Sequence, residues 1–231
     1  MHTPEHFRMD PAALQSLLGG HGAGELITAT TRGLLATLVP FVHDAGAGPH
    51  GALLGHLARN NDQWRLPAQG EAMVVLRGPD AYVSPQSYAS KAEHGRVVPT
   101  WNYVTAHVYG ELVVHDDPQW TRHLVERLTR HHEGDGPTAW QVGDAPAAFI
   151  AGQLRAIVGI EVRITRIEAK AKLSQNRPAA DVDGVVRDAR DRGDLPMAAA
   201  VAAARGERGS GRGRRTGPAP TDRAPAGPTT T

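Results

Sequence analysis

The sequence predicts an α+β fold around a small closed or half-open β-barrel with peripheral helices. About six or seven segments rich in β-branched and apolar residues run along the chain, most of them joined by short turns. Helical segments are fewer and lie between or after these strands. The chain has 231 residues, 40% of them hydrophobic, so it can bury a core without a metal or disulfide.

The first elements are a helix and a hairpin. Asp10-Pro11 begins the helix, because a carboxylate caps free amides and proline needs no hydrogen bond in the first turn. Gly19-Gly20 ends it. Residues 25–30 and 34–42 are strands around the turn 31–33, and 44–51 is a loop by composition.

Three further strands are expected before residue 85. They span 52–58, 71–77 and 81–84, and the turn dipeptide Gly78-Pro79 separates the last two. Residues 61–69 form a short helix at best.

Residues 100–114 give the clearest strand pattern in the chain, since aromatic and β-branched residues fill the segment. Alternation places Trp101, Tyr103, Thr105, His107 and Tyr109 on one face and Asn102, Val104, Ala106 and Val108 on the other. The aromatic face either stacks on the planar ring of a ligand or forms a core layer under a helix.

The second half of the chain alternates helices with one strand. Helices are expected from Asp117-Pro118 to about 132, after Asp144-Ala145-Pro146, and over 181–192 and 195–204; the strand spans 158–167. Residues 1–204 therefore form one domain. Residues 205–231 are expected to be a disordered basic Arg/Gly/Pro tail, with six arginines against two carboxylates.

Composition excludes several classes of protein. The net charge of +1 argues against a uniformly basic polyanion binder. The absence of cysteine excludes thiolate catalysis and disulfide scaffolding, and suits a reducing cytoplasm. No apolar run approaches a membrane span and no signal peptide is apparent, so we expect a cytoplasmic protein without membrane contact.

Residues 55–64, GHLARNNDQW, are the first candidate site. Amides at the start of a short helix, with Arg59 beside them, would suit a phosphate. The alternative is that Asn60 or Asn61 only caps the helix and Arg59 is solvated. His56 is either a hydrogen-bonded core residue or a metal or heme ligand.

The second candidate is KLSQNRP, residues 172–178, which follows the last predicted strand. Five hydrogen-bonding side chains lie in seven residues, so this loop either binds an anion or caps the next helix.

Taken in order, GHLARNNDQW, GPDAYVSP (78–85), KAEHGRVVPTWNY (91–103), LRAIVGIEV (154–162) and KLSQNRP resemble the PaiB-like FMN-binding negative transcriptional regulators. The resemblance covers about residues 1–195. It implies a split β-barrel like that of pyridoxamine-phosphate oxidases, built as a homodimer with two FMN sites at the subunit interface. The residues assigned to the cofactor site are His56, Ala58, Arg59, Asn60, Trp101, Asn102, Tyr103, Lys172, Ser174 and Gln175.

The same family is similar to heme-dependent piperazate synthases, which form a nitrogen–nitrogen bond. In that alternative the cofactor is heme b and His56 looks like the axial ligand. Ala171 and Ser87-Tyr88-Ala89 replace bulkier residues common in the family, which enlarges or loosens a pocket. No helix-turn-helix is apparent, so contact with DNA or another nucleic acid rests on the basic tail alone.

Overall fold

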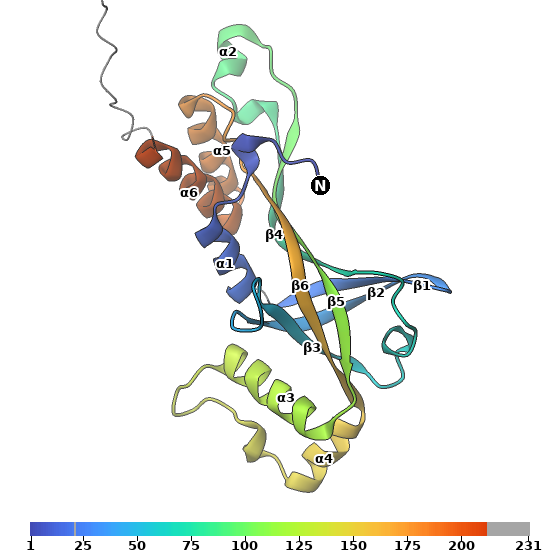
Figure 1. The fold of residues 1–231 in the computed structure, drawn as a ribbon. Helices are drawn as coiled ribbons and strands as arrows, with labels where there is room; N and C mark the ends of the chain where they lie inside the picture. Colours follow the sequence, from blue (N-terminus) through green and yellow to red (C-terminus); the bar gives the residue numbers. More distant parts are fainter. Residues whose placement is uncertain (21, 212–231) are drawn as a thin grey trace, which may run out of the picture.

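A computed structural model describes residues 1–20 and 22–211, and its centre is a closed antiparallel barrel (Figure 1). The strands are β1 (Ala23–Thr30), β2 (Gly33–Asp44), β3 (Ala52–Ala58), β4 (Ala72–Val83), β5 (Thr100–His115) and β6 (Ile157–Lys172). They follow the spatial order β1-β2-β3-β6-β5-β4, and β1 pairs with β4 to close the ring. The predicted barrel is therefore confirmed.

The helices lie around this barrel rather than within it. They are α1 (Pro11–Gly20), α2 (Ser90–His94), α3 (Pro118–Glu133), α4 (Ala147–Arg155), α5 (Ala179–Asp191) and α6 (Leu195–Gly211). Single 3-10 turns occur at Glu5–Phe7, Asp62–Trp64, Pro85–Ser87 and Val142–Asp144. The predicted caps are present: the Asp10 and Asp117 carboxylates each accept two backbone N–H groups at a helix start.

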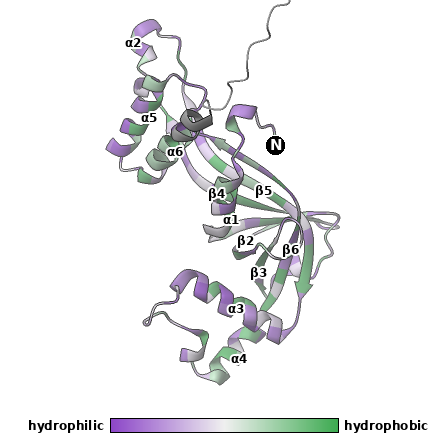
Figure 2. Ribbon diagram, turned by 60° about the vertical axis from the view of Figure 1, so that its left-hand side comes forward, coloured by the Kyte–Doolittle hydropathy of each residue, from purple (hydrophilic) through white to green (hydrophobic). Residues whose placement is uncertain are grey.

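The barrel core is made by alternating residues of every strand. Leu26, Val39, Leu53, Val74 and Ile160 are among its fully buried members. Their neighbours in sequence point outward, as a two-residue period requires. Helix α3 packs Leu124 and Leu128 on the outer side of β3, and Figure 2 shows that the rest of α3 is largely hydrophilic.

Strands β5 and β6 are longer than the barrel and join two helical regions. At one end they carry the corner with α3 and α4, and at the other they meet α5 and α6 (Figure 1). The α5–α6 pair covers the sheet there through a second core that includes Val83, Leu173, Val185 and Val201. No helix of the described residues is long and apolar enough to cross a bilayer.

Three expected boundaries were wrong. β4 is one strand, because Gly78-Pro79 forms an irregularity between Arg77 and Asp80 instead of a turn. β6 continues to Lys172, five residues beyond its expected end, because it pairs with β5 along that length. Helix α6 continues to Gly211, past the expected helix end at residue 204, and residues 212–231 of the predicted tail lie outside the described residues.

Candidate functional site

The expected cofactor residues fall into two groups at opposite ends of β6. His56, Ala58, Arg59 and Asn60 lie at the end of β3, where Ala58 is in register with Ile157. The second group lies at the other end of β6, where Tyr103 is in register with Lys172. It consists of Trp101, Asn102, Tyr103, Lys172, Ser174 and Gln175. The two ends of β6 are separated by about 50 Å of strand at ~3.3 Å per residue. One protomer therefore does not bring the two groups into one site.

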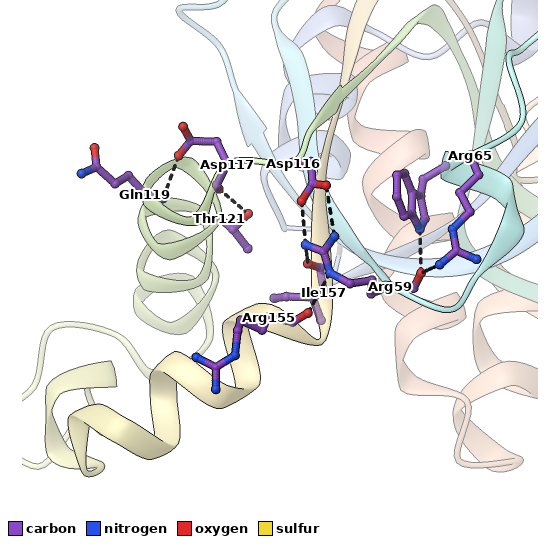
Figure 3. Close-up of polar contacts among 9 residues, drawn as sticks. Arg59, Arg65, Asp116, Asp117, Gln119, Thr121, Arg155 and Ile157 are labelled. Atoms are coloured by element: carbon purple, nitrogen blue, oxygen red, sulfur yellow. Dashed lines mark hydrogen bonds and ion pairs between the residues drawn. The ribbon is translucent and has the colours of Figure 1, made fainter.

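Arg59 is held by the protein's own acceptors (Figure 3). Its Nη2 and Nη1 atoms lie 2.6 and 3.1 Å from the Asp116 carboxylate oxygens. Its Nε donates to the Arg155 carbonyl and its Nη2 also donates to the Ile157 carbonyl. The Asp116 contact raises the pKa of Arg59, and Arg59 in turn lowers the pKa of Asp116. Four of the five guanidinium N–H groups are thus occupied.

The turn after Arg59 is organised by internal contacts. Trp64 Nε1 and Arg65 Nη2 both donate to the Arg59 carbonyl oxygen, at 3.0 and 2.7 Å. The Asn61 side chain caps the single 3-10 turn by accepting from the Gln63 amide. Ala58 and Asn60 are exposed. The capping alternative describes this turn better than an open phosphate cradle does.

His56 lies between β3 and α3, on the strand face that carries Leu54 and Ala58. It lines a cavity of about 320 Å³ together with Leu128, His132 and Trp140. Burial lowers the pKa of His56, and its Nδ1 has no hydrogen-bond partner among the described residues. The imidazole is therefore favoured in its neutral form. Among the described residues, no cluster of three or more His, Cys, Asp or Glu side chains could hold a metal ion.

In the second group, three polar residues are used to build the end of the sheet. Asn102 and Ser174 are buried and exchange two hydrogen bonds, of 3.0 and 3.2 Å. Ser174 has a φ of 63°, a left-handed conformation that costs free energy in a residue other than glycine. The Gln175 amide accepts from the Leu173 N–H and donates to the Ala171 carbonyl. These three side chains position the strand end instead of facing solvent.

Three cations gather at this strand end. Lys172 Nζ donates to Thr100 Oγ1 and to the Trp101 carbonyl, at 2.6 and 2.5 Å. Burial, followed by the charges of Lys170 and Arg177, lowers the pKa of Lys172. Within the described part of the chain, none of the three pairs with a carboxylate. Glu168, two residues before Lys170, is bound by the N-terminal amine and Arg166.

Aromatic side chains surround these cations on the outer face of the sheet. Trp101 is 55% exposed, and its ring centroid lies 6.1 Å from that of Tyr82. Lys170 Nζ lies 5.4 Å from the Tyr103 ring and 5.9 Å from the Phe7 ring. The aromatic face is therefore accessible at Trp101 and half-buried at Tyr103. Of the two alternatives for this face, the core layer under a helix does not apply, because the buried side holds Asn102, Ala106 and Val108. We call Phe7, Tyr82, Trp101, Tyr103, Lys170, Lys172 and Arg177 the cation–aromatic surface.

The sequence reasoning did not single out Lys170, Phe7 and Tyr82. Lys170 stands two residues before Lys172, so strand alternation alone would have placed both ammonium groups on one face. Phe7 is 7% exposed and lies beneath the two lysines, with its ring centroid 5.9 Å from each ammonium group. Arg8, the next residue, forms a bridge with Lys170, and nothing local in the sequence indicates that contact.

Comparisons with known proteins agree with this architecture. The family described as "Putative FMN-binding domain" matches residues 1–166. An uncharacterized protein of Emericella nidulans is 31% identical over 217 residues, covering 78% of this chain and 86% of the relative. Protease synthase and sporulation protein PAI 2 of Bacillus subtilis is 28% identical over 189 residues, covering 80% and 87%.

Two solved structures share the fold at low identity. The flavocytochrome Anf3 of Azotobacter vinelandii has a TM-score of 0.55 at 12% identity, covering 74% of this chain and 72% of that one. The FAD and heme binding protein of Mycobacterium smegmatis has a TM-score of 0.52 at 14% identity, covering 73% and 74%. The family match, which extends over most of the chain, supports FMN as the cofactor. The chain therefore belongs to the PaiB-like family of FMN-binding proteins and has a split-barrel fold.

Proposed function

We propose that this protein is a homodimeric, FMN-dependent sensor or regulator whose cofactor binds at the cation–aromatic surface. The observation that carries the proposal is a cluster of three cations that have no carboxylate partner among the described residues and lie beside the exposed Trp101 ring. FMN combines the two features that such a surface would recognise, a phosphate dianion and a planar ring system.

The cations suit the phosphate because their charges are not neutralised within the described part of the protomer. Lys170 and Arg177 already disfavour the charged form of Lys172, so an anion beside all three would relieve this repulsion. Arg59 is a poorer candidate, since Asp116 occupies its guanidinium.

The aromatic side chains suit the ring. Trp101 and Tyr82 extend the outer face next to Lys172, and Tyr103 lies beside Lys170. Stacking on such rings contributes about 0.5–1.5 kcal/mol beyond the area buried. When bound, FMN supplies redox chemistry, while these residues would bind and orient it.

A second protomer would complete the site. The His56–Asn60 group lies far from the cation–aromatic surface within one chain, so the two groups can adjoin only across a subunit interface. The outer face of β1 and β2 offers apolar area for such an interface, including Leu34 at 76% and Leu38 at 63% exposure.

The regulatory part of the proposal is supported by the relative named as a protease synthase and sporulation protein. The basic residues beyond 205 would be the segment to contact DNA or another nucleic acid. The two heme-containing neighbours show the fold alone at their identity, so we do not propose a heme enzyme.

The decisive experiment compares FMN with riboflavin, which lacks the phosphate. Lys172→Ala and Lys170→Ala should each weaken FMN by about 10- to 100-fold, the loss expected for one charge-assisted hydrogen bond, and leave riboflavin nearly unchanged. Affinities are measured by quenching of flavin fluorescence.

Lys91→Ala is the matched control, because Lys91 is the remaining lysine and its Nζ contacts Gln86 on the surface. It should bind both flavins as the unaltered protein does. Equal losses of FMN and riboflavin in the Lys170 and Lys172 variants would contradict a phosphate site at this surface.

A further inference from the structure

A second cavity lies on the opposite face of the sheet from the cation–aromatic surface. It has a volume of about 340 Å³ and opens between α1, the ends of β4, β5 and β6, and α6. Its walls include Ala13, Leu17, Val104, Ala171 and Ala203. We propose that this cavity binds a small apolar molecule carrying one uncharged polar group.

The cavity exists because small side chains line it from several directions. Ala171 contributes the β6 wall, and Ala200, Ala203 and Ala204 form one face of α6 at helical spacing. The irregularity at Gly78-Pro79 bounds the cavity on β4. A hollow of about 340 Å³ that is lined mainly by apolar side chains has the size and the lining of a small-molecule site.

The charged residues of the lining determine the charge of the ligand. Arg8 and Asp10 both line the cavity, but Arg8 pairs with Glu5 at 2.9 Å and Asp10 caps α1. With opposite charges that are already partnered, the lining favours neither an anion nor a cation. The Ser16 hydroxyl, which also lines the cavity, can donate to or accept from an uncharged polar group.

The volume sets the size of the ligand. An engineered apolar cavity of about 150 Å³ binds benzene, so this one has room for a two-ring aromatic molecule or an equivalent aliphatic one. Of the four polar side chains in the lining, Arg8, Asp10 and Gln175 already have partners, and the remaining one is Ser16. This lining argues against a sugar or nucleotide. This inference does not rest on FMN binding.

The test uses 2-naphthol, which has two fused rings and one hydroxyl group. It is titrated calorimetrically into the full-length protein, and variants of the cavity wall distinguish binding in this cavity from binding at the aromatic surface. We expect saturable binding at one site per chain. Ala203→Leu, which fills the cavity from α6, should weaken binding at least about tenfold, the equivalent of 1.4 kcal/mol.

Ala202→Leu is the matched control. Ala202 and Ala203 are adjacent and both exposed, but only Ala203 lines the cavity. Ala202→Leu should therefore bind 2-naphthol as the unaltered protein does, and Ala171→Phe should weaken binding from the opposite wall. Absence of saturable binding to the unaltered protein, or equal affinities in all variants, would overturn the proposal.

Discussion

The guanidinium of Arg59 and the carboxylate of Asp116 form a two-point ion pair across the end of the barrel, with contacts of 2.6 and 3.1 Å. Arg59 follows β3, and Asp116 lies between β5 and α3. The same guanidinium also donates to the carbonyls of Arg155, the last residue of α4, and Ile157, the first residue of β6. One side chain thus ties together three segments that are distant in sequence.

This arrangement predicts a structural role for Arg59. Arg59→Ala and Asp116→Ala should each lower the melting temperature, and the double variant should lose little more than either single variant, because the pair acts as a unit. The ratio of FMN to riboflavin affinity should stay unchanged in Arg59→Ala. A selective loss of FMN affinity in that variant would instead show that Arg59 binds the phosphate.

The depressed pKa of Lys172 predicts a pH dependence of cofactor binding. Because the folded protein disfavours the charged ammonium, Lys172 loses its proton below the usual lysine pKa of 10.5. FMN affinity should therefore fall as the pH rises toward that value, while riboflavin affinity stays level. Lys172→Arg, which remains charged, should move the fall in FMN affinity to higher pH. Parallel profiles for the two flavins would contradict this prediction.

His56 predicts sensitivity of the fold to acid. Its pKa is lowered by burial, so between the usual value of 6.5 and the lower folded value the unfolded chain binds more protons. The free energy of unfolding should accordingly decrease as the pH falls through this window. His56→Leu should reduce that decrease without lowering stability at neutral pH, since Nδ1 has no partner to lose among the described residues.

The control for His56 is His50→Leu, an exposed histidine in the loop between β2 and β3. It should leave the pH dependence of unfolding unchanged. The His56→Leu variant should also keep bound FMN, whereas a heme cofactor would lose its axial ligand and its Soret band would shift.

The outer face of β2 predicts where two protomers meet. Leu34→Glu should convert the proposed homodimer to a monomer, because it would place a charge in an apolar interface. Since Leu34 is 76% exposed, the change should cost little stability within one chain. Leu195→Glu is the matched control, as Leu195 is 64% exposed at the start of α6. Light scattering that gives the same mass for both variants would refute this interface.

Local sequence patterns predicted most elements of this fold. The cap at Asp117, the hairpin around residues 31–33 and the alternation of residues 100–109 all depend on neighbours in the chain. The irregularity at Gly78-Pro79 was misread because the dipeptide has the composition of a turn, and only pairing with β5 keeps the strand continuous. The extension of β6 to Lys172 has the same cause.

The candidate site was predictable in part. Trp101, Tyr103 and Lys172 meet on one surface because the register of β5 and β6 brings two sequence motifs together. The pairing of Arg59 with Asp116 spans 57 residues and has no local signature. Asn102, Ser174 and Gln175 were assigned to the cofactor through the family resemblance, whereas in the structure their side chains form hydrogen bonds that fix the strand end.

The alternation of β6 has a mechanical consequence. Lys170 and Lys172 extend from one side of this strand, and Ala171 extends from the other, yet all three share a single run of peptide units. Each peptide unit is planar and is shared by two neighbouring residues, so a displacement of the backbone at Ala171 also acts on the residues that carry the two lysines. The space behind the strand and the cations in front of it are therefore separated by a single layer of backbone.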